Sequence, residues 1–254
     1  MCTAAGLPGA RGRCRLRDAA AATTGPPRWL AVGFADLEGS TPLVRIAKAI
    51  LEASEEVARR DPAMRRIAAT VGPADLRRGR PRRSHFAELA RAICYQQLAG
   101  AAARAIHGRF EALFDGSGPT PEAVLALPEE TLRGAGLSGS KTASIRDLAT
   151  KVLDGSVELD RVGRLSDADI VGELTLVRGI GRWTAEMFLM FNLLRPDVFP
   201  LDDLGLQKGI RVSYFRGRKV SLKTMKRLGE TWRPWRTVAS WYLWRSLDPL
   251  PVEY

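Results

Sequence analysis

The feature that most constrains this sequence is a pair of helical patterns joined by Gly179-Ile180-Gly181. The first pattern opens with Ser166-Asp-Ala-Asp169, a weak form of the capping box, and is expected to run to Gly179. The second pattern carries apolar residues at helical spacing as far as Leu194. Glycines let the backbone turn sharply, and Ile180 between them is expected to enter the core. The sequence therefore predicts a helical hairpin over residues 166–192.

The start of the second hairpin helix has a charge preference. Backbone N–H groups around Gly181 carry a partial positive charge that suits a phosphate. The whole chain has the same preference, because 39 Lys and Arg stand against 28 Asp and Glu, a net charge of +11. Such a balance favours a polyanionic partner over an acidic small molecule, although a basic but otherwise ordinary protein stays an alternative.

The cysteines and the apolar runs indicate the redox compartment of the protein and whether it associates with a membrane. The three cysteines are an odd number and two of them lie near the N-terminus, which favours a reducing compartment over a disulfide framework. They form no CxxC pair, so no ligand set for an iron–sulfur cluster is expected. The longest apolar run, Met187 to Leu194, is too short to cross a bilayer, so no membrane association is expected. Residues 1–28 are rich in Ala, Arg and Gly. The segment 1–40 is expected to be disordered or irregular, with an organelle transit peptide as the alternative.

No segment alternates apolar and polar residues for long enough to form a sheet, so residues 41–254 are expected to be all-α. Ser140 is expected to cap one helix, Pro234 to begin the last, and residues 77–83 to form an arginine-rich linker. Helices are predicted over 42–60, 62–71, 101–114, 121–127, 129–133, 141–153, 222–232 and 234–247. One further helix is predicted, with Tyr95-Gln96-Gln97-Leu98 at its C-terminal end.

The hairpin is the centre of a longer pattern. That pattern reads Leu174-x-x-Val177-x-Gly179-Ile180-Gly181-x-Trp183-Thr184-Ala185, then an apolar helix face, then Asp197-Val-Phe-Pro-Leu-Asp-Asp203. It closely resembles the helix-hairpin-helix DNA glycosylase superfamily, and within it the 3-methyladenine DNA glycosylase II branch of alkylated-base enzymes. The resemblance extends from about Asp61 to Pro249. It implies two helical subdomains flanking a cleft, with a helix-hairpin-helix and a Gly/Pro-Asp loop.

The resemblance assigns the chemistry to one carboxylate. The family's catalytic aspartate is the second of an Asp-Asp pair, which is Asp203 here, and Asp202 is then expected to cap the next helix. Departure of a base leaves positive charge on the sugar, which a nearby carboxylate stabilises while it helps water to attack. Bifunctional relatives carry a nucleophilic lysine where this chain has Trp183, so the resemblance implies a monofunctional enzyme. Two capping aspartates without chemistry stay the alternative.

The resemblance also places the pocket for the flipped base. The pocket residues it implies are Trp183, Trp244, Met187, Tyr95 and Gln96. An electron-rich indole attracts a cationic alkylated purine by about 0.5–2 kcal/mol. Met187 stands where some relatives have a tyrosine, so the pocket is expected to differ in breadth or preference. Gln97 and Leu98 fall where the family inserts a wedge into the duplex, and the choice between them stays open.

The remaining expectations concern DNA and ions. DNA-backbone contacts are expected from Gly179, Gly181, Arg182 and Thr184. In the family the hairpin also holds a monovalent cation, Na⁺ or K⁺, by main-chain carbonyls that correspond to those of Thr175, Val177 and Ile180. No other cofactor is expected. The expected partner is double-stranded DNA that contains damaged bases, bound by a monomer.

The expected function is therefore a monofunctional DNA glycosylase that flips and excises alkylated purines, such as 3-methyladenine and 7-methylguanine, in base excision repair. One alternative keeps the fold and acts on deaminated or oxidised bases. Another is a non-catalytic helix-hairpin-helix DNA-binding protein, whose binding would fall with salt without any abasic product. The expected location is cytoplasmic and nucleoid-associated, or nuclear in a eukaryote.

Overall fold

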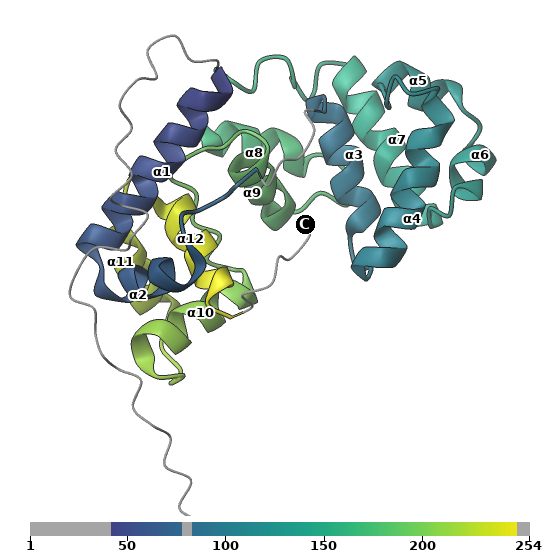
Figure 1. The fold of residues 1–254 in the computed structure, drawn as a ribbon. Helices are drawn as coiled ribbons and strands as arrows, with labels where there is room; N and C mark the ends of the chain where they lie inside the picture. The colour runs from purple at the N-terminus through teal and green to yellow at the C-terminus, as the bar shows by residue number, and fades with distance from the viewer. Residues whose placement is uncertain (1–41, 78–82, 248–254) are drawn as a thin grey trace, which may run out of the picture. The chain divides into compact units, whose positions relative to one another are not determined.

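The computed structural model describes residues 42–77 and 83–247, which form helices and no strands (Figure 1). The expected all-α fold is therefore confirmed. Residues 1–40 and most of the arginine-rich linker lie outside the described residues, so the expectations for them stay predictions. No helix in the described ranges is long and apolar enough to cross a membrane.

Several of the helices begin after a capping side chain or at a proline. The helices are α1 (Pro42–Arg60), α2 (Pro62–Val71), α3 (His85–Tyr95), α4 (Gly100–Glu111), the 3-10 turn η2 (Ala112–Phe114), α5 (Pro121–Ala126), α6 (Glu129–Gly134), α7 (Gly139–Leu153), α8 (Asp167–Thr175), α9 (Arg182–Phe191), α10 (Leu204–Phe215), α11 (Leu222–Glu230) and α12 (Arg236–Arg245). The predicted bounds of α1 and α2 are confirmed, since a proline begins each helix.

Two predicted helix starts are wrong. Ser138, and not Ser140, caps α7, because the Ser138 hydroxyl accepts a hydrogen bond from the Lys141 amide at 3.3 Å. The last helix begins at Arg236 rather than at Pro234. Residues 232–235 form a separate turn instead, closed by the Trp235 amide that donates to the Trp232 carbonyl at 2.8 Å.

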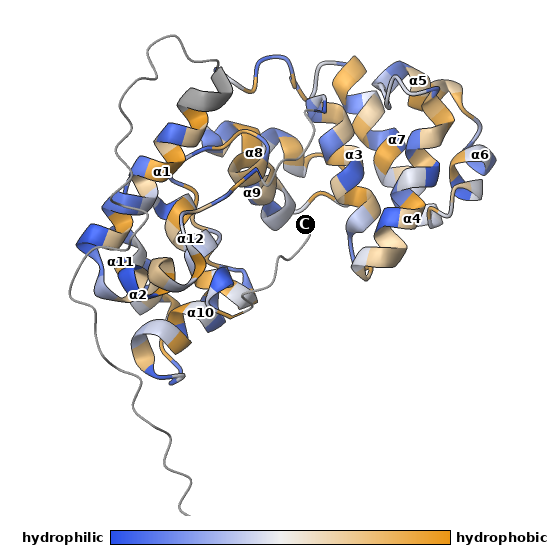
Figure 2. Ribbon diagram, in the orientation of Figure 1, coloured by the Kyte–Doolittle hydropathy of each residue, from blue (hydrophilic) through white to orange (hydrophobic). Residues whose placement is uncertain are grey.

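One apolar core joins α3 to α9. Its fully buried side chains include Leu89 of α3, Ile145 and Leu148 of α7, and Leu189 of α9. Apolar and polar residues share the surface of each of these helices, as expected for elements with one buried side (Figure 2). The hairpin of α8 and α9 is therefore fastened to the preceding helices by its own core residues.

Helices α1, α2, α10 and α12 pack together as a second group, and Asp61 lies at one of its junctions. Its Oδ1 caps α2 by accepting from the amides of Ala63 at 2.8 Å and Met64 at 3.1 Å. Its Oδ2 accepts from the Tyr214 hydroxyl at 2.7 Å and from Trp232 Nε1 at 3.0 Å. One carboxylate thus links the start of α2 to α10 and to the end of α11.

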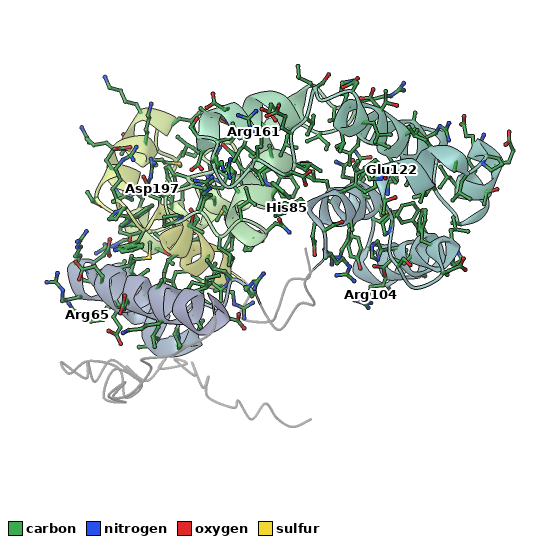
Figure 3. The ribbon with its side chains drawn as sticks, turned by 90° about the horizontal axis from the view of Figure 1, so that it is seen from above. Arg65, His85, Arg104, Glu122, Arg161 and Asp197 are labelled. Atoms are coloured by element: carbon green, nitrogen blue, oxygen red, sulfur yellow. The ribbon has the colours of Figure 1, made fainter. Side chains whose placement is uncertain are left out.

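The loop between α9 and α10 is anchored to the C-terminal helices at Asp197, which Figure 3 labels. Arg236 donates to Asp197 Oδ1 at 2.6 Å, and Arg233 also pairs with this carboxylate. Phe199 lies against Gly229, where an added Cβ would meet the ring at 2.5 Å. Because the loop is held at both residues, it presents the following Asp-Asp pair in a defined position.

Candidate active site

The hairpin turns at Gly179. Helix α8 ends at Thr175 rather than at the predicted Gly179, and the intervening residues form a tight turn. Gly179 has φ 77°, and a Cβ there would lie 2.5 Å from Ser144 Oγ on α7. Glycine is thus required by both backbone and space. Ile180 is 3% exposed, which confirms that it enters the core.

Gly181 has a different reason for lacking a side chain. It is the N-cap of α9 with an ordinary φ of −91°, and an added Cβ would meet nothing within 4 Å. Neither strain nor internal packing therefore demands glycine at this exposed position. An open backbone at a helix start is what close approach of a phosphate needs.

The two hairpin glycines should respond differently to alanine. Gly179→Ala is expected to lower the free energy of unfolding by about 1–3 kcal/mol, because alanine would be strained at this φ and would collide with Ser144. Gly181→Ala should change stability by less than about 0.5 kcal/mol and should weaken DNA binding instead. Urea unfolding and binding to a labelled duplex measure both effects. Equal stabilities for the two variants would contradict this assignment.

The Asp-Asp pair before α10 contains the cap of that helix, but the capping residue is not the expected one. Asp203, and not Asp202, caps α10, because its Oδ1 accepts from the Leu206 amide at 2.5 Å. Asp202 is exposed instead. The backbone of Asp203 is extended, with φ −70° and ψ 120°, as an N-cap residue requires. The prediction that Asp202 is the cap was therefore wrong.

Two indoles hold the Asp203 carboxylate. Trp183 Nε1 donates to Oδ2 at 2.9 Å, and Trp244 Nε1 donates to Oδ1 at 2.8 Å. Gly205 gives the second indole room, since a Cβ there would lie 3.0 Å from Asp203 Oδ1 and 3.3 Å from Trp244 Cδ1. The carboxylate acts only as an acceptor in these contacts, and three donors from three helices fix its orientation.

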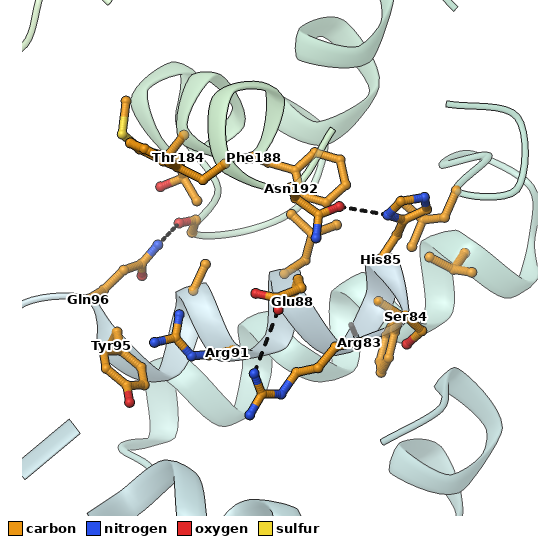
Figure 4. A pocket seen from close by; sticks show the side chains of 18 of the residues that line it. Arg83, Ser84, His85, Glu88, Arg91, Tyr95, Gln96, Thr184, Phe188 and Asn192 are labelled. Carbon is orange, nitrogen blue, oxygen red and sulfur yellow. Dashed lines mark hydrogen bonds and ion pairs between the residues drawn. The ribbon is translucent and has the colours of Figure 1, made fainter. Parts of the chain in front are cut away.

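A cavity of about 1180 Å³ lies between α3 and α9 (Figure 4), and Asp203 is not among the residues that line it. Its volume exceeds the roughly 300–1,000 Å³ usual for small-molecule sites, so it has room for more than a single base. Trp183 connects cavity and carboxylate, because its ring lines the cavity while its N–H donates to Asp203. Trp183 is 42% exposed, so part of this residue is accessible to a ligand.

Helices α3 and α9 are linked at both ends of the cavity. At one end, Gln96 Nε2 donates to the Gly179 carbonyl at 2.9 Å. At the other, His85 Nδ1 lies 2.7 Å from Asn192 Oδ1, an acceptor, so this ring nitrogen is the donor. Figure 4 shows both links. Two hydrogen bonds therefore cross the cavity, and the carbonyl oxygen and the second N–H of the Gln96 amide stay available to a ligand.

The structure brings together most of the residues that the sequence associates with a base pocket. The expected pocket residues that line the cavity are Trp183, Met187, Tyr95 and Gln96. The expected wedge residues Gln97 and Leu98 and the expected backbone contacts Gly179 and Thr184 also line it. Trp244, the other expected pocket residue, does not line it; its ring packs against Phe191 with centroids 6.2 Å apart. Gln97 is exposed at φ 57°, a rare backbone conformation that is concentrated at functional sites.

Sequence reasoning missed the polar side of the cavity on α3. Glu88 and Arg91 line it, and Figure 4 shows both on the same side as Tyr95. Arg83 Nη1 lies 3.7 Å from Glu88 Oε1. The signal was present, because polar residues recur every three or four positions opposite the buried stripe of this helix. Only the packing of α9 across that face turns them into lining residues.

Arg182, an expected DNA contact, is attached to a buried carboxylate. Its Nε donates to Glu186 Oε1 at 2.9 Å across one turn of α9. The Arg182 side chain is 68% exposed and that of Glu186 only 7%. Burial raises the pKa of Glu186, Arg182 opposes the rise, and Asp202 and Asp203 add to it. The guanidinium is thus held at the surface by a carboxylate that has little access to water.

The core beneath the cavity contains a histidine that should make stability depend on pH. Burial lowers the pKa of His107 from 6.5 to about 4; Glu111 opposes the change, while Arg83 and Arg91 add to it. Between pH 6.5 and about pH 4, His107 is therefore protonated in the unfolded chain and neutral in the folded chain. Stability should be intact above pH 6.5 and fall by on the order of 3 kcal/mol as pH approaches 4. Urea unfolding of wild type and His107→Gln across this range checks the slope, which the variant should lack.

The main-chain carbonyls expected to hold a monovalent cation lie in the hairpin turn. Within the described ranges, no cluster of His, Cys, Asp and Glu could hold a metal ion. The Val177 carbonyl accepts a hydrogen bond from the Ile180 amide at 3.0 Å. A carbonyl oxygen has a second lone pair, so this contact leaves it able to bind a hard cation. Oxygen donors are the ligand type that a hard cation takes, and the expectation that the carbonyls of Thr175, Val177 and Ile180 bind Na⁺ or K⁺ stays a prediction.

The chain belongs to the HhH-GPD superfamily of base excision DNA repair proteins, whose family model matches residues 90–234.

The most similar relatives include DNA-3-methyladenine glycosylase 1 of Schizosaccharomyces pombe, which is 35% identical over 72% of this chain and 81% of its own length. A solved structure of that enzyme, Mag1, in complex with abasic DNA has a TM-score of 0.68 over 79% of this chain and all of the other, at 33% identity. A DNA-3-methyladenine glycosidase from Bacillus halodurans has a TM-score of 0.70 over 77% and 89% of the chains, also at 33% identity. The expected family and the enzyme class, a DNA N-glycosylase, are confirmed.

Proposed function

We propose that this protein is a monofunctional DNA glycosylase that excises alkylated purines, such as 3-methyladenine and 7-methylguanine, from duplex DNA in base excision repair. The single observation that carries the proposal is the Asp203 carboxylate, oriented by the indole N–H groups of Trp183, which lines the cavity, and Trp244. The relatives named for 3-methyladenine support the choice of lesion.

In the proposed reaction a damaged nucleotide leaves the stack and its base enters the cavity. Trp183 stacks on the base, and the attraction is strongest when alkylation makes the ring cationic. As the N-glycosidic bond breaks, positive charge develops on the sugar and Asp203 stabilises it. Asp203 then accepts a proton from the water that attacks the anomeric carbon. The products are the free base and an abasic site.

The absence of a suitable amine at Trp183 supports a hydrolytic course. A strand-cutting enzyme needs an amine that forms a Schiff base with the sugar. In this chain the corresponding side chain is an indole whose N–H donates to Asp203, and an indole nitrogen is a donor with no nucleophilic lone pair. The strand is therefore left intact in the proposed reaction.

In this proposal the hairpin binds the DNA backbone. The amides that follow Gly181 bind a phosphate, Arg182 and Thr184 lie in the same first turn, and Gln97 or Leu98 fills the gap left in the duplex. A monovalent cation on the carbonyls of the hairpin turn would add positive charge next to that phosphate. We propose that a monomer suffices for all of these contacts.

A lesion panel tests the proposal against its closest alternative. Short duplexes that carry one alkylated, one deaminated or one oxidised base are incubated with the protein, and strands are analysed before and after alkali. Release from the alkylated duplex alone, with strand breaks only after alkali, is the expected result. Preference for the deaminated or oxidised base would keep the fold and overturn the proposed lesion.

A further inference from the structure

A long basic segment follows Asp203 and has no part in the proposed chemistry. Between Leu204 and Gly229 the sequence contains eight Lys or Arg residues and no Asp or Glu. The segment comprises α10, the turn after it and α11 as far as Gly229, and we call it the basic arm (Figure 1). A run of this length without a single acidic residue is unusual even in a chain with a net charge of +11.

The charges of the basic arm are not neutralised within the protein. None of its eight basic side chains forms an ion pair within residues 42–77 and 83–247. Just beyond the arm, in contrast, Arg233 and Arg236 pair with Asp197 and Glu230. Unpaired like charges repel one another and destabilise the compact state unless a polyanion binds them.

The basic side chains lie on the solvent side of the arm. On α10, Leu206 and Ile210 are buried while Lys208 is exposed, so the helix turns its charge outward. On α11 the buried residue is Met225, and Lys223 and Lys226 are exposed. The charges therefore form an accessible surface rather than part of the core.

The arm starts at the reaction centre. Asp203 is the N-cap of α10, and this helix of 12 residues extends for about 18 Å away from it. At roughly 3.4 Å per base step this length matches about five base pairs. The other end of the arm returns to the same loop, because Gly229 packs against Phe199.

We propose that the basic arm binds the backbone of the duplex that flanks the lesion on one side, as a second DNA contact separate from the hairpin. This inference rests on the proposed function, since Asp203 fixes where the DNA begins. The chemistry is that of lysine and arginine side chains on phosphates, which is independent of sequence. Continuity with Asp203 favours duplex DNA over a free RNA or an acidic protein as the occupant.

The test removes four charges in two matched proteins. The arm variant is Arg218→Gln/Lys219→Gln/Lys223→Gln/Lys226→Gln, whose residues are all exposed; Arg216 is spared because its φ is 52°. The control variant is Lys48→Gln/Arg59→Gln/Arg104→Gln/Arg133→Gln, on helices other than α10 and α11. Circular dichroism and thermal melting establish that both proteins fold.

Binding to an abasic-site duplex is then measured from 50 to 200 mM salt. The arm variant is expected to bind at least about tenfold more weakly at 50 mM and to show a salt slope smaller by about 2–4, while the control stays near wild type. Trimming the flanking duplex on one side by five base pairs should weaken the wild type but not the arm variant. Equal losses in both variants, or a loss only with RNA, would overturn the inference.

The outcome is separable from that of the proposed function. Base release under saturating protein concentrations should be the same for the arm variant and the wild type, since none of the four residues touches Asp203. If the wild type releases no base, the proposed function fails. The affinity measurements then still test whether the basic arm binds DNA. If the arm variant binds like the wild type, the arm inference fails and the proposed function stands.

Discussion

Asp203→Asn is expected to lower the rate of base release about 10²- to 10⁴-fold. The neutral amide cannot stabilise positive charge on the sugar or accept a proton from water. It also presents N–H groups to the indole donors that now contact both carboxylate oxygens. Single-turnover release from an alkylated duplex, with protein in excess, measures the chemical step. DNA affinity should stay within a few-fold of wild type, because Asp203 is not a phosphate ligand.

The neighbouring residue provides the control. Asp202→Asn removes the same charge one residue before Asp203. The Asp202 side chain is exposed and does not cap α10. The variant should retain base release within about tenfold, the change that 1.4 kcal/mol in the barrier would cause. Comparable losses in the two variants would mean that the site needs negative charge in general rather than the oriented carboxylate of Asp203.

Asp61→Ala is expected to cost about 2–4 kcal/mol of unfolding free energy, the largest stability effect of any single substitution considered. Loss of the α2 cap accounts for about 1 kcal/mol. The rest comes from the Tyr214 hydroxyl and Trp232 indole, which lose their acceptor in a protein interior. Trp232 is only 2% exposed, so water cannot readily replace the carboxylate there. Urea unfolding followed by far-ultraviolet circular dichroism measures the change.

A simple helix cap is the matched control for Asp61. Ser221 caps α11 through one hydrogen bond from the Thr224 amide at 3.2 Å and has no further donor to satisfy outside that turn. Ser221→Ala should cost about 1 kcal/mol. A cost for Asp61→Ala no greater than that of Ser221→Ala would show that the contacts to Tyr214 and Trp232 contribute nothing net.

Local signals were enough to predict most of the fold. Pro62 with Asp61 before it marks the start of α2, and Ser166 caps α8 with its hydroxyl on the Asp169 amide at 3.2 Å. Ile180 between two glycines was correctly expected in the core. These features depend on residues a few positions apart, so the sequence contains all the information that they require.

The errors and omissions have physical causes of another kind. Which member of the Asp-Asp pair caps α10 depends on which residue is extended where the chain enters the helix, and both are good capping residues. Trp244 was expected to face the flipped base, yet it holds Asp203 and packs on Phe191. The polar wall with Glu88 exists only because α9 crosses α3. Such facts come from tertiary packing, which residue spacing does not specify.

The most direct measurement is the product that wild-type protein releases from N-methylated duplex DNA. Chromatography with mass detection identifies free bases, and a gel run before and after alkali reports on the strand. The account predicts free 3-methyladenine or 7-methylguanine and strands that break only after alkali. Tight binding to the methylated duplex without any free base would contradict it, and so would strand cleavage before alkali.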